Sequence, residues 1–129
     1  MIVDKRNAEI ICTAHAGGKT HDFKLYKQSV GTAVTDKIKI EGDSGYQGIL
    51  KLHQNSETPK KKPRNDKLTP KEKATNKLLS SRRMLVENII AKVKVFKIMA
   101  NKYRNRRRRF ALRMSLICAV INFENKLLN

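Results

Sequence analysis

The sequence predicts an α/β protein with short strands in its first half and long helices in its second. Residues 1–52 hold short apolar runs, many of them β-branched, that polar turns and glycines separate. Residues 53–70 are polar, carry all three prolines and include the Lys60–Lys62 run, which is typical of a loop or an irregular strand. From Lys71 to Asn129 no glycine or proline interrupts the chain. We expect one domain with a sheet half (1–52), a basic loop (53–70) and a helical part (70–129).

The first elements follow from apolar runs at either side of a polar turn. Met1–Val3 and Ala8–Ala14 are such runs, and they predict a β-hairpin. His15–Thr20 contains two glycines and predicts a loop. His21–Ser29 has apolar residues at roughly helical spacing, with Asp22 in the first turn, where a carboxylate suits the helix dipole. A hairpin, a loop and a short helix are therefore expected in this order.

A further strand is expected over Lys37–Ile40, where apolar and basic residues alternate. It runs into Glu41–Gly45, in which an aspartate, Asp43, stands between two glycines. A strand that ends in this way presents a carboxylate at the edge of a sheet. A short segment, Tyr46–Leu52, leads on to the basic loop.

Two helices are expected in the second half. Thr69, Pro70 and Glu72 fit the N-cap, first and third positions of a helix that we expect to run over Pro70–Met99. A break near Asn101–Arg104 precedes a second expected helix, Arg106–Leu128. The first helix has an apolar-rich stripe formed by Leu78, Leu79, Arg82, Val86, Ile89, Ile90, Val93 and Phe96. The second is expected to bury Phe110, Leu112, Leu116, Ile117, Val120 and Phe123.

The charge of the chain is concentrated in one segment. The 129 residues carry a formal net charge of +18. Between Lys60 and Arg113 there are 20 basic and 3 acidic residues, a net charge of +17. A polycation of this kind indicates a polyanionic partner, most often nucleic acid, with an anionic membrane surface or an acidic protein as alternatives. The charged segment includes most of the helical part, which we therefore expect to face DNA.

Cysteine usage and hydropathy indicate a cytoplasmic protein. Cys12 and Cys118 both lie in apolar runs, as buried thiols do in a reducing compartment. No cysteine or histidine pair has zinc-finger spacing, and His15 and His53 are expected at the surface or in loops, not as metal ligands. The sequence shows no signal-peptide pattern and no apolar run near the ~20 residues of a membrane span.

Five stretches occur in the same order in one protein family. By these stretches the chain resembles bacterial insertion-sequence transposases of the DDE type, a group related to the Harbinger endonucleases, over essentially its whole length. The stretches are His21–Lys27 (HDFKLYK), Gly42–Gly48 (GDSGYQG), Thr58–Lys73, Val86–Lys94 (VENIIAKVK) and Tyr103–Phe110.

The resemblance implies an RNase-H-like fold in which three carboxylates hold two divalent ions that cleave and join DNA strands. Mg²⁺, or Mn²⁺ in its place, is the expected metal. The family's second acidic ligand maps onto Asp43 and the third onto Glu87. The residues expected to contact the DNA backbone are Lys60, Lys61, Lys62, Lys94, Lys97, Arg104, Arg106, Arg107, Arg108 and Arg109.

The family's first aspartate has no counterpart in this sequence. It lies on a strand that precedes the hairpin, and Asp4 belongs to the second-strand motif instead. We therefore expect an incomplete RNase-H-like domain without its first strand, inactive alone and binding metal only if that aspartate is supplied. Strands around Ile10 and Ile38 would then have unpaired edges, which predicts poor solubility, self-association or an upstream transposase fragment as partner.

Each assignment has a structural alternative. Asp43 could cap a glycine turn, and Glu87 could pair with Arg83 one helical turn away, worth ~0.3 kcal/mol. For Asp22 we favour helix capping and positioning over a supporting role near the metals. Arg106–Arg109 could be a solvated helix face. Two other functions remain open: a non-catalytic nucleic-acid-binding protein that uses only the basic segment, and a small ribosome-associated protein. The transposase hypothesis adds DNA at transposon ends as partner, and a cytoplasmic, nucleoid-associated location.

Overall fold

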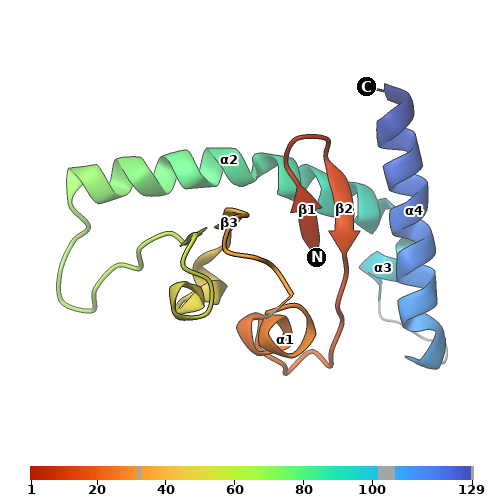
Figure 1. Cartoon of the computed structure of the whole chain (residues 1–129), viewed down its shortest axis with the longest axis horizontal. Coiled ribbons are helices and arrows are strands. Elements are labelled where there is room, and N and C mark those ends of the chain that lie inside the picture. Colours follow the sequence, from red (N-terminus) through yellow and green to blue (C-terminus); the bar gives the residue numbers. More distant parts are fainter. Residues whose placement is uncertain (32, 102–106, 129) are drawn as a thin grey trace. The chain divides into compact units, whose positions relative to one another are not determined.

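The structure is a computed structural model that describes residues 1–31, 33–101 and 107–128 (Figure 1). The chain forms two compact units. The first consists of Met1–His15 and Met84–Asn129, and the second of Ala16–Arg83. Helices and small two-stranded sheets occur together, so the expected mixture of α and β structure with long C-terminal helices is confirmed.

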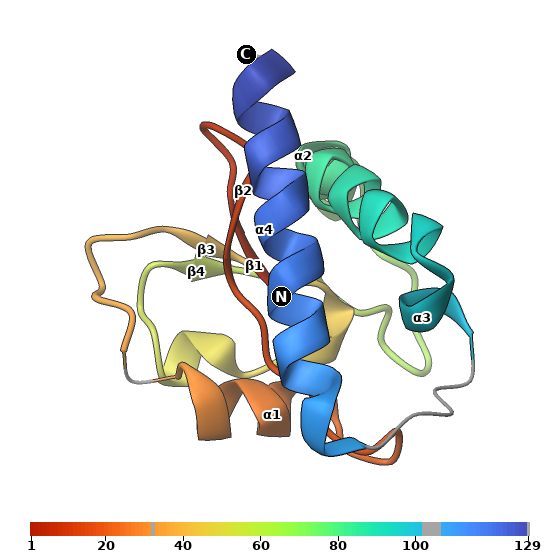
Figure 2. The same ribbon diagram turned by 90° about the vertical axis from the view of Figure 1, so that its right-hand side faces the viewer.

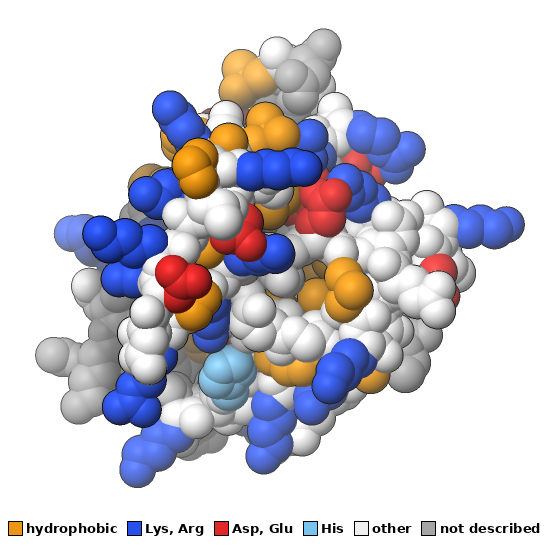
Figure 3. All heavy atoms as spheres, turned by 90° about the vertical axis from the view of Figure 1, so that its left-hand side faces the viewer, with side chains coloured by type: hydrophobic (Ala, Val, Ile, Leu, Met, Phe, Trp, Pro, Cys, Tyr) orange, Lys and Arg blue, Asp and Glu red, His pale blue; other side chains and the backbone are white. Residues whose placement is uncertain are grey.

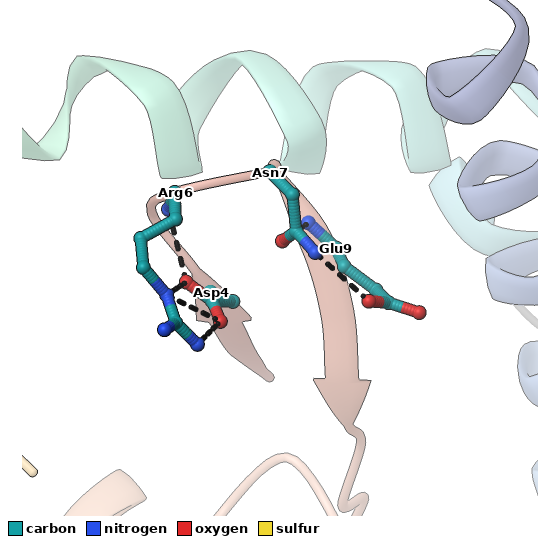
Figure 4. A network of polar contacts seen from close by, with 4 residues as sticks. All are labelled: Asp4, Arg6, Asn7 and Glu9. Atoms are coloured by element: carbon teal, nitrogen blue, oxygen red, sulfur yellow. Dashed lines mark hydrogen bonds and ion pairs between the residues drawn. The ribbon is translucent and has the colours of Figure 1, made fainter. Parts of the chain in front are cut away.

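The first unit begins with the predicted hairpin. Strands β1 (Ile2–Asp4) and β2 (Glu9–Cys12) pair in antiparallel register, with an irregularity after Ile2. Figure 4 shows the turn between them. There the Asp4 carboxylate accepts hydrogen bonds from the backbone N–H and the guanidinium of Arg6, the shortest at 2.6 Å, and Asn7 bonds to Glu9. The hydrogen bonds from Arg6 lower the pKa of Asp4 to about 2, so this carboxylate is committed to the turn.

The core of the first unit lies between the hairpin and three helices: α2 (Pro70–Val95) from Met84 onward, α3 (Lys97–Ala100) and α4 (Phe110–Leu128). A 3₁₀ turn, η3 (Arg107–Arg109), leads into α4. Figure 2 shows β2 running beside α4. The buried core residues are Ile10, Ile89, Val93, Ile117, Cys118 and Ile121.

Two asparagines of α4 join this helix to the hairpin. The Asn122 side chain accepts from the N–H of Ile10 at 2.8 Å and donates to the Ile10 carbonyl at 3.0 Å. Asn125, one turn later, donates to the carbonyl of Ala8 at 3.1 Å and accepts from Lys92 Nζ at 2.7 Å. Asn122 therefore takes the place of a neighbouring strand, and the expectation of unpaired backbone at Ile10 is wrong.

The predicted buried face of α4 is also wrong in most of its members. Ile117 is buried as expected, but four of the six residues are exposed. The helix is apolar on two sides, and hydrophobic periodicity alone does not say which side meets the core. The side that meets the core carries Cys118, Ile121 and the two asparagines. It does so because Asn122 bonds to the edge of β2 and Asn125 bonds to the Ala8 carbonyl just before that strand. The exposed four are Leu112, Leu116, Val120 and Phe123.

Helix α2 ends earlier than predicted. It stops at Val95 instead of Met99, because Phe96 has an extended backbone with ψ 105°. The short helix that follows turns Ile98 and Met99 toward the core cluster. Tertiary packing thus breaks the helix where neither glycine nor proline marks an end. None of the helices within the described ranges is long and apolar enough to cross a membrane.

The second unit contains α1 (Asp22–Ser29), where a helix was predicted. Its N-cap is His21, whose Nδ1 accepts from the N–H of Phe23 at 3.3 Å, so His21 and not Asp22 caps the helix. Strands β3 (Ile40–Glu41) and β4 (Ser56–Glu57) form a parallel pair. The 3₁₀ turns η1 (Ser44–Tyr46) and η2 (Ile49–Lys51) lie between these strands in the chain.

One further prediction needs correction in this unit, and the burial of one histidine was not expected. The strand expected over Lys37–Ile40 is reduced to its end, because the N–H of Ile38 closes a turn on the carbonyl of Thr35 at 3.0 Å. His53 lies in a loop, one of the two settings expected for it, but its ring is only 1% exposed, and Nε2 lies 3.0 Å from the same Thr35 carbonyl. A buried histidine thus anchors the loop that leads to β3.

The start of α2, within the second unit, is the predicted capping box. The N–H of Glu72 donates to Thr69 Oγ1 at 3.2 Å, and the N–H of Thr69 donates to Glu72 Oε2 at 3.0 Å. Lys60 Nζ lies 2.9 Å from Glu72 Oε1. These hydrogen bonds, that of Lys60 first, lower the pKa of Glu72 to about 2.

Candidate functional site

Asp43 stands directly after the parallel strand pair, as the sequence predicts. The N–H of Ile40 donates to the carbonyl of Asn55, and that of Gly42 to the carbonyl of Glu57, both at 2.9 Å, which fixes the chain up to Asp43. Asp43 is then the N-cap of η1, and its Oδ1 accepts from the N–H of Gly45 at 2.7 Å. The half-buried carboxylate therefore has one oxygen in a local turn, the structural alternative anticipated for it.

A second carboxylate approaches the same glycine. A Cβ built on Gly45 would lie 2.9 Å from Asp43 Oδ1 and 4.0 Å from Asp22 Oδ2. Asp22 reaches this place from the first turn of α1. Burial, and after it the negative charges of Asp22 and Asp43, raise the pKa of Tyr46. The second unit thus gathers two carboxylates and a tyrosine around Gly45.

Three aromatic rings support this arrangement. The rings of Phe23 and Tyr26 stack with centroids 6.5 Å apart, and Tyr26 meets Tyr46 edge-on at 6.0 Å. Gly48, with φ 92°, lets the chain turn beside Phe23, which a Cβ at this position would approach to 3.7 Å. Since α1 carries both Asp22 and Tyr26, the ring contacts fix the position of its carboxylate relative to η1.

An ion-pair group that the sequence reasoning missed lies beside the strand pair. Arg82 Nη1 lies 3.6 Å from Glu41 Oε1 and 3.7 Å from Glu57 Oε2, and Lys39 Nζ lies 2.7 Å from Glu57 Oε1. Glu41 is only 11% exposed. Arg82 had been assigned to the apolar-rich stripe of the helix, so only its charge within that stripe could have pointed to this role.

Carboxylate oxygens are the ligands that Mg²⁺ prefers. Within the described ranges, however, no group of three or more His, Cys, Asp or Glu side chains could hold a metal ion. Asp22 and Asp43 therefore do not make a complete metal site by themselves. Glu87, the other predicted ligand, is an exposed residue of α2 that belongs to the first unit, whereas Asp43 belongs to the second.

The predicted DNA-contacting residues are exposed wherever the structure describes their side chains. Lys60 also pairs with Glu72. Arg104 and Arg106 lie outside the described residues, as does the side chain of Arg107. Figure 3 shows one face on which Lys and Arg side chains are widely spread and acidic ones are few. The exposed members of the predicted set are Lys60, Lys61, Lys62, Lys94, Lys97, Arg108 and Arg109.

Comparison with known proteins identifies the family. Residues 1–122 match the family described as DDE superfamily endonuclease. A curated relative, "Probable transposase for insertion sequence element IS702" from Microchaete diplosiphon, is 43% identical over 124 residues. The match covers 96% of this chain and 45% of that relative, so the chain spans less than half of the relative's length. No solved structure matches. With the family match extending from the hairpin into α4, the chain belongs to the DDE superfamily of endonucleases.

Proposed function

We propose that the chain forms part of the catalytic domain of an insertion-sequence transposase, with an RNase-H-like arrangement in the intact domain. The observation that carries the proposal is the family match over residues 1–122, together with 43% identity to a probable transposase. The position of Asp43 directly after β3, fixed by the parallel pairing of that strand, supports it. DNA, specifically the ends of an insertion sequence, is the proposed partner.

Asp43 and Glu87 are the proposed metal-binding carboxylates, with Mg²⁺ or Mn²⁺ as the cation. The divalent ions would supply Lewis-acid activation of the attacking oxygen and of the phosphodiester. The half-buried setting of Asp43 supports its part in this, because its environment is less solvated than that of a surface carboxylate. Since two carboxylates hold two ions poorly, the chain alone should not cleave DNA.

Paramagnetic Mn²⁺ tests the carboxylate assignment. In two-dimensional NMR spectra of the full chain, recorded with an upstream transposase fragment that supplies the first aspartate, Mn²⁺ should broaden the amide signals around Gly45 and around Glu87. Asp43→Asn and Glu87→Gln should each reduce the broadening around the substituted residue. Asp66→Asn, which removes an exposed carboxylate of the basic loop, is the matched control and should change neither region. Broadening that ignores both substitutions would contradict the assignment.

Salt dependence tests the DNA assignment. Fluorescence anisotropy with a labelled duplex should give an affinity that falls steeply with salt, because each phosphate contact adds ~0.9 to the log–log slope. Lys61→Ala with Lys62→Ala should reduce the slope by roughly 2. The control pair Lys24→Ala with Lys51→Ala removes the same charge outside the basic segment and should change the slope less.

A plasmid-nicking assay tests the DDE mechanism, and the Mn²⁺ spectra separate the proposal from its alternative, a non-catalytic nucleic-acid-binding protein. With Mg²⁺ or Mn²⁺, the chain alone should bind plasmid without nicking it. Robust nicking that survived both Asp43→Ala and Glu87→Ala would overturn the DDE mechanism. DNA binding without any Mn²⁺ effect at Asp43 or Glu87, even when the upstream fragment is present, would favour the alternative, which the concentration of charge between Lys60 and Arg113 supports.

A further inference from the structure

The side of α4 that faces away from the core is an uninterrupted apolar surface. Its residues recur at spacings of three and four, which places them on one side of a helix with 3.6 residues per turn. They lie opposite the core-facing residues Ile117, Cys118 and Ile121. Their exposed fractions range from 56% to 71%. This apolar stripe of α4 consists of Leu112, Leu116, Val120, Phe123 and Leu127.

The stripe of α4 is a continuous series of large apolar side chains along one helix. Isolated exposed apolar residues are common, but a contiguous series along one helix indicates a covered surface. The five side chains expose on the order of 500 Å², so a symmetric pair of stripes would bury on the order of 1,000 Å², the lower limit for a specific protein interface. Complete burial of both stripes would thus just reach the area that a specific dimer needs.

We propose that the apolar stripe of α4 is a dimerisation surface on which α4 of a second copy packs in antiparallel orientation. In this register Leu112 lies opposite Leu127 of the second copy, Leu116 lies opposite its Phe123, and Val120 lies near the two-fold axis. Such a self-complementary patch is what a symmetric dimer requires. The proposal does not depend on the transposase function.

The distribution of charge selects the antiparallel orientation. Arg108 and Arg109 are exposed just before the stripe begins. A parallel pair would bring these arginines of both copies together, which is unfavourable. An antiparallel pair separates them and places each set near the last turn of the other helix, whose carbonyl groups form the negative end of the helix dipole. The basic residue of that turn, Lys126, lies 3.6 Å from Glu9, which offsets its charge.

Sedimentation equilibrium of the full chain tests the proposal. A dimer of twice the 14.8 kDa chain mass is expected. Because the chain carries a net charge of +18, added salt should screen repulsion between the copies and strengthen the dimer. Val120→Asp places two like charges at the axis and should raise the dissociation constant at least ~10-fold. Ser115→Asp adds the same charge at an exposed position of α4 outside the stripe and should have little effect.

Disulfide trapping tests the orientation. In a background of Cys12→Ser, with Cys118 only 5% exposed, Leu112→Cys and Leu127→Cys are prepared separately and mixed under oxidising conditions. The antiparallel dimer should give the mixed Leu112→Cys with Leu127→Cys product and no product of Leu112→Cys with itself. A monomeric wild type, an association indifferent to Val120→Asp, or self-trapping of Leu112→Cys would overturn the proposal. Circular dichroism melts of each variant ensure that loss of the dimer is not loss of folding.

Discussion

Replacing Asn122 by alanine tests how α4 is attached to the hairpin. The side chain of Asn122 makes two hydrogen bonds, both to the backbone of Ile10, and no other side chain described for this unit bonds to that residue. The substitution leaves the Ile10 N–H and carbonyl without these partners in a partly buried place. The side chain of Ile10 itself, 6% exposed, stays in the core.

The expected loss can be worked out from the two bonds. Each ordinary hydrogen bond contributes about 0.5–1.5 kcal/mol, so Asn122→Ala should lower the free energy of unfolding by about 1–3 kcal/mol. The upper half of this range applies if water does not reach the Ile10 groups. Asn122→Asp is an informative partner variant, since it keeps the acceptor for the Ile10 N–H but removes the donor to its carbonyl.

Urea denaturation followed by circular dichroism measures the loss, and amide hydrogen exchange locates it. Exchange at Ile10 should accelerate in Asn122→Ala more than exchange at Val93, a core residue of α2. The Ile10 amide should exchange more slowly in Asn122→Asp than in Asn122→Ala. If the Ile10 amide exchanged at the wild-type rate in Asn122→Ala, the Asn122 side chain would not be the partner that protects this edge of β2.

Three further outcomes are expected. Because its pKa is lowered, Glu72 stabilises the fold above pH 4.5, and this contribution is lost as the pH falls toward about 2. Lys60→Met removes the largest cause of the lowered pKa, so the melting temperature of this variant should depend less on pH in that window. Gly48→Ala should lower the free energy of unfolding in urea by about 1–2 kcal/mol, because alanine is strained at a positive φ. The added Cβ would meet Phe23 at an ordinary 3.7 Å, so no clash contributes, and an unchanged urea midpoint would contradict this. Ile121→Ala, at a side chain 1% exposed, should cost about 2–5 kcal/mol by the same measurement, and a cost below 1 kcal/mol would place Ile121 outside the core.

Local signals in the sequence predicted much of the fold. The hairpin follows from two apolar runs around a polar turn, and α1 and the capping box at Thr69 and Glu72 follow from short-range patterns. These elements depend on residues within a few positions of one another. The mixed α/β class was predictable for the same reason.

Features that depend on distant contacts were not predictable. The end of α2 at Val95 reflects the packing of Ile98 and Met99, and the core-facing side of α4 reflects the bonds of Asn122 to a strand 112 residues away in sequence. The burial of His53 likewise depends on the carbonyl of Thr35. Periodicity identifies an apolar side of a helix but not the element it meets.

The candidate site divides in the same way. Placing Asp43 after a strand and before a glycine turn needed only local sequence, and the structure confirms that placement. The approach of Asp22 to the same glycine, and the Arg82 ion pairs beside β3, need the packing of α1 and α2. The assignment of Asp43 and Glu87 as joint metal ligands stays a prediction.

Gly45 has no positive φ that would require glycine, yet a larger residue at this position would disturb its neighbour. Scales of conformational preference would rate alanine there as harmless. Yet the added methyl group would occupy the space of Asp43 Oδ1, and this oxygen, at the end of a short side chain, is free to rotate aside. Gly45→Ala would thus fold normally while the Asp43 side chain takes another rotamer. A mutational survey that measures only protein abundance would not detect this displacement of the carboxylate.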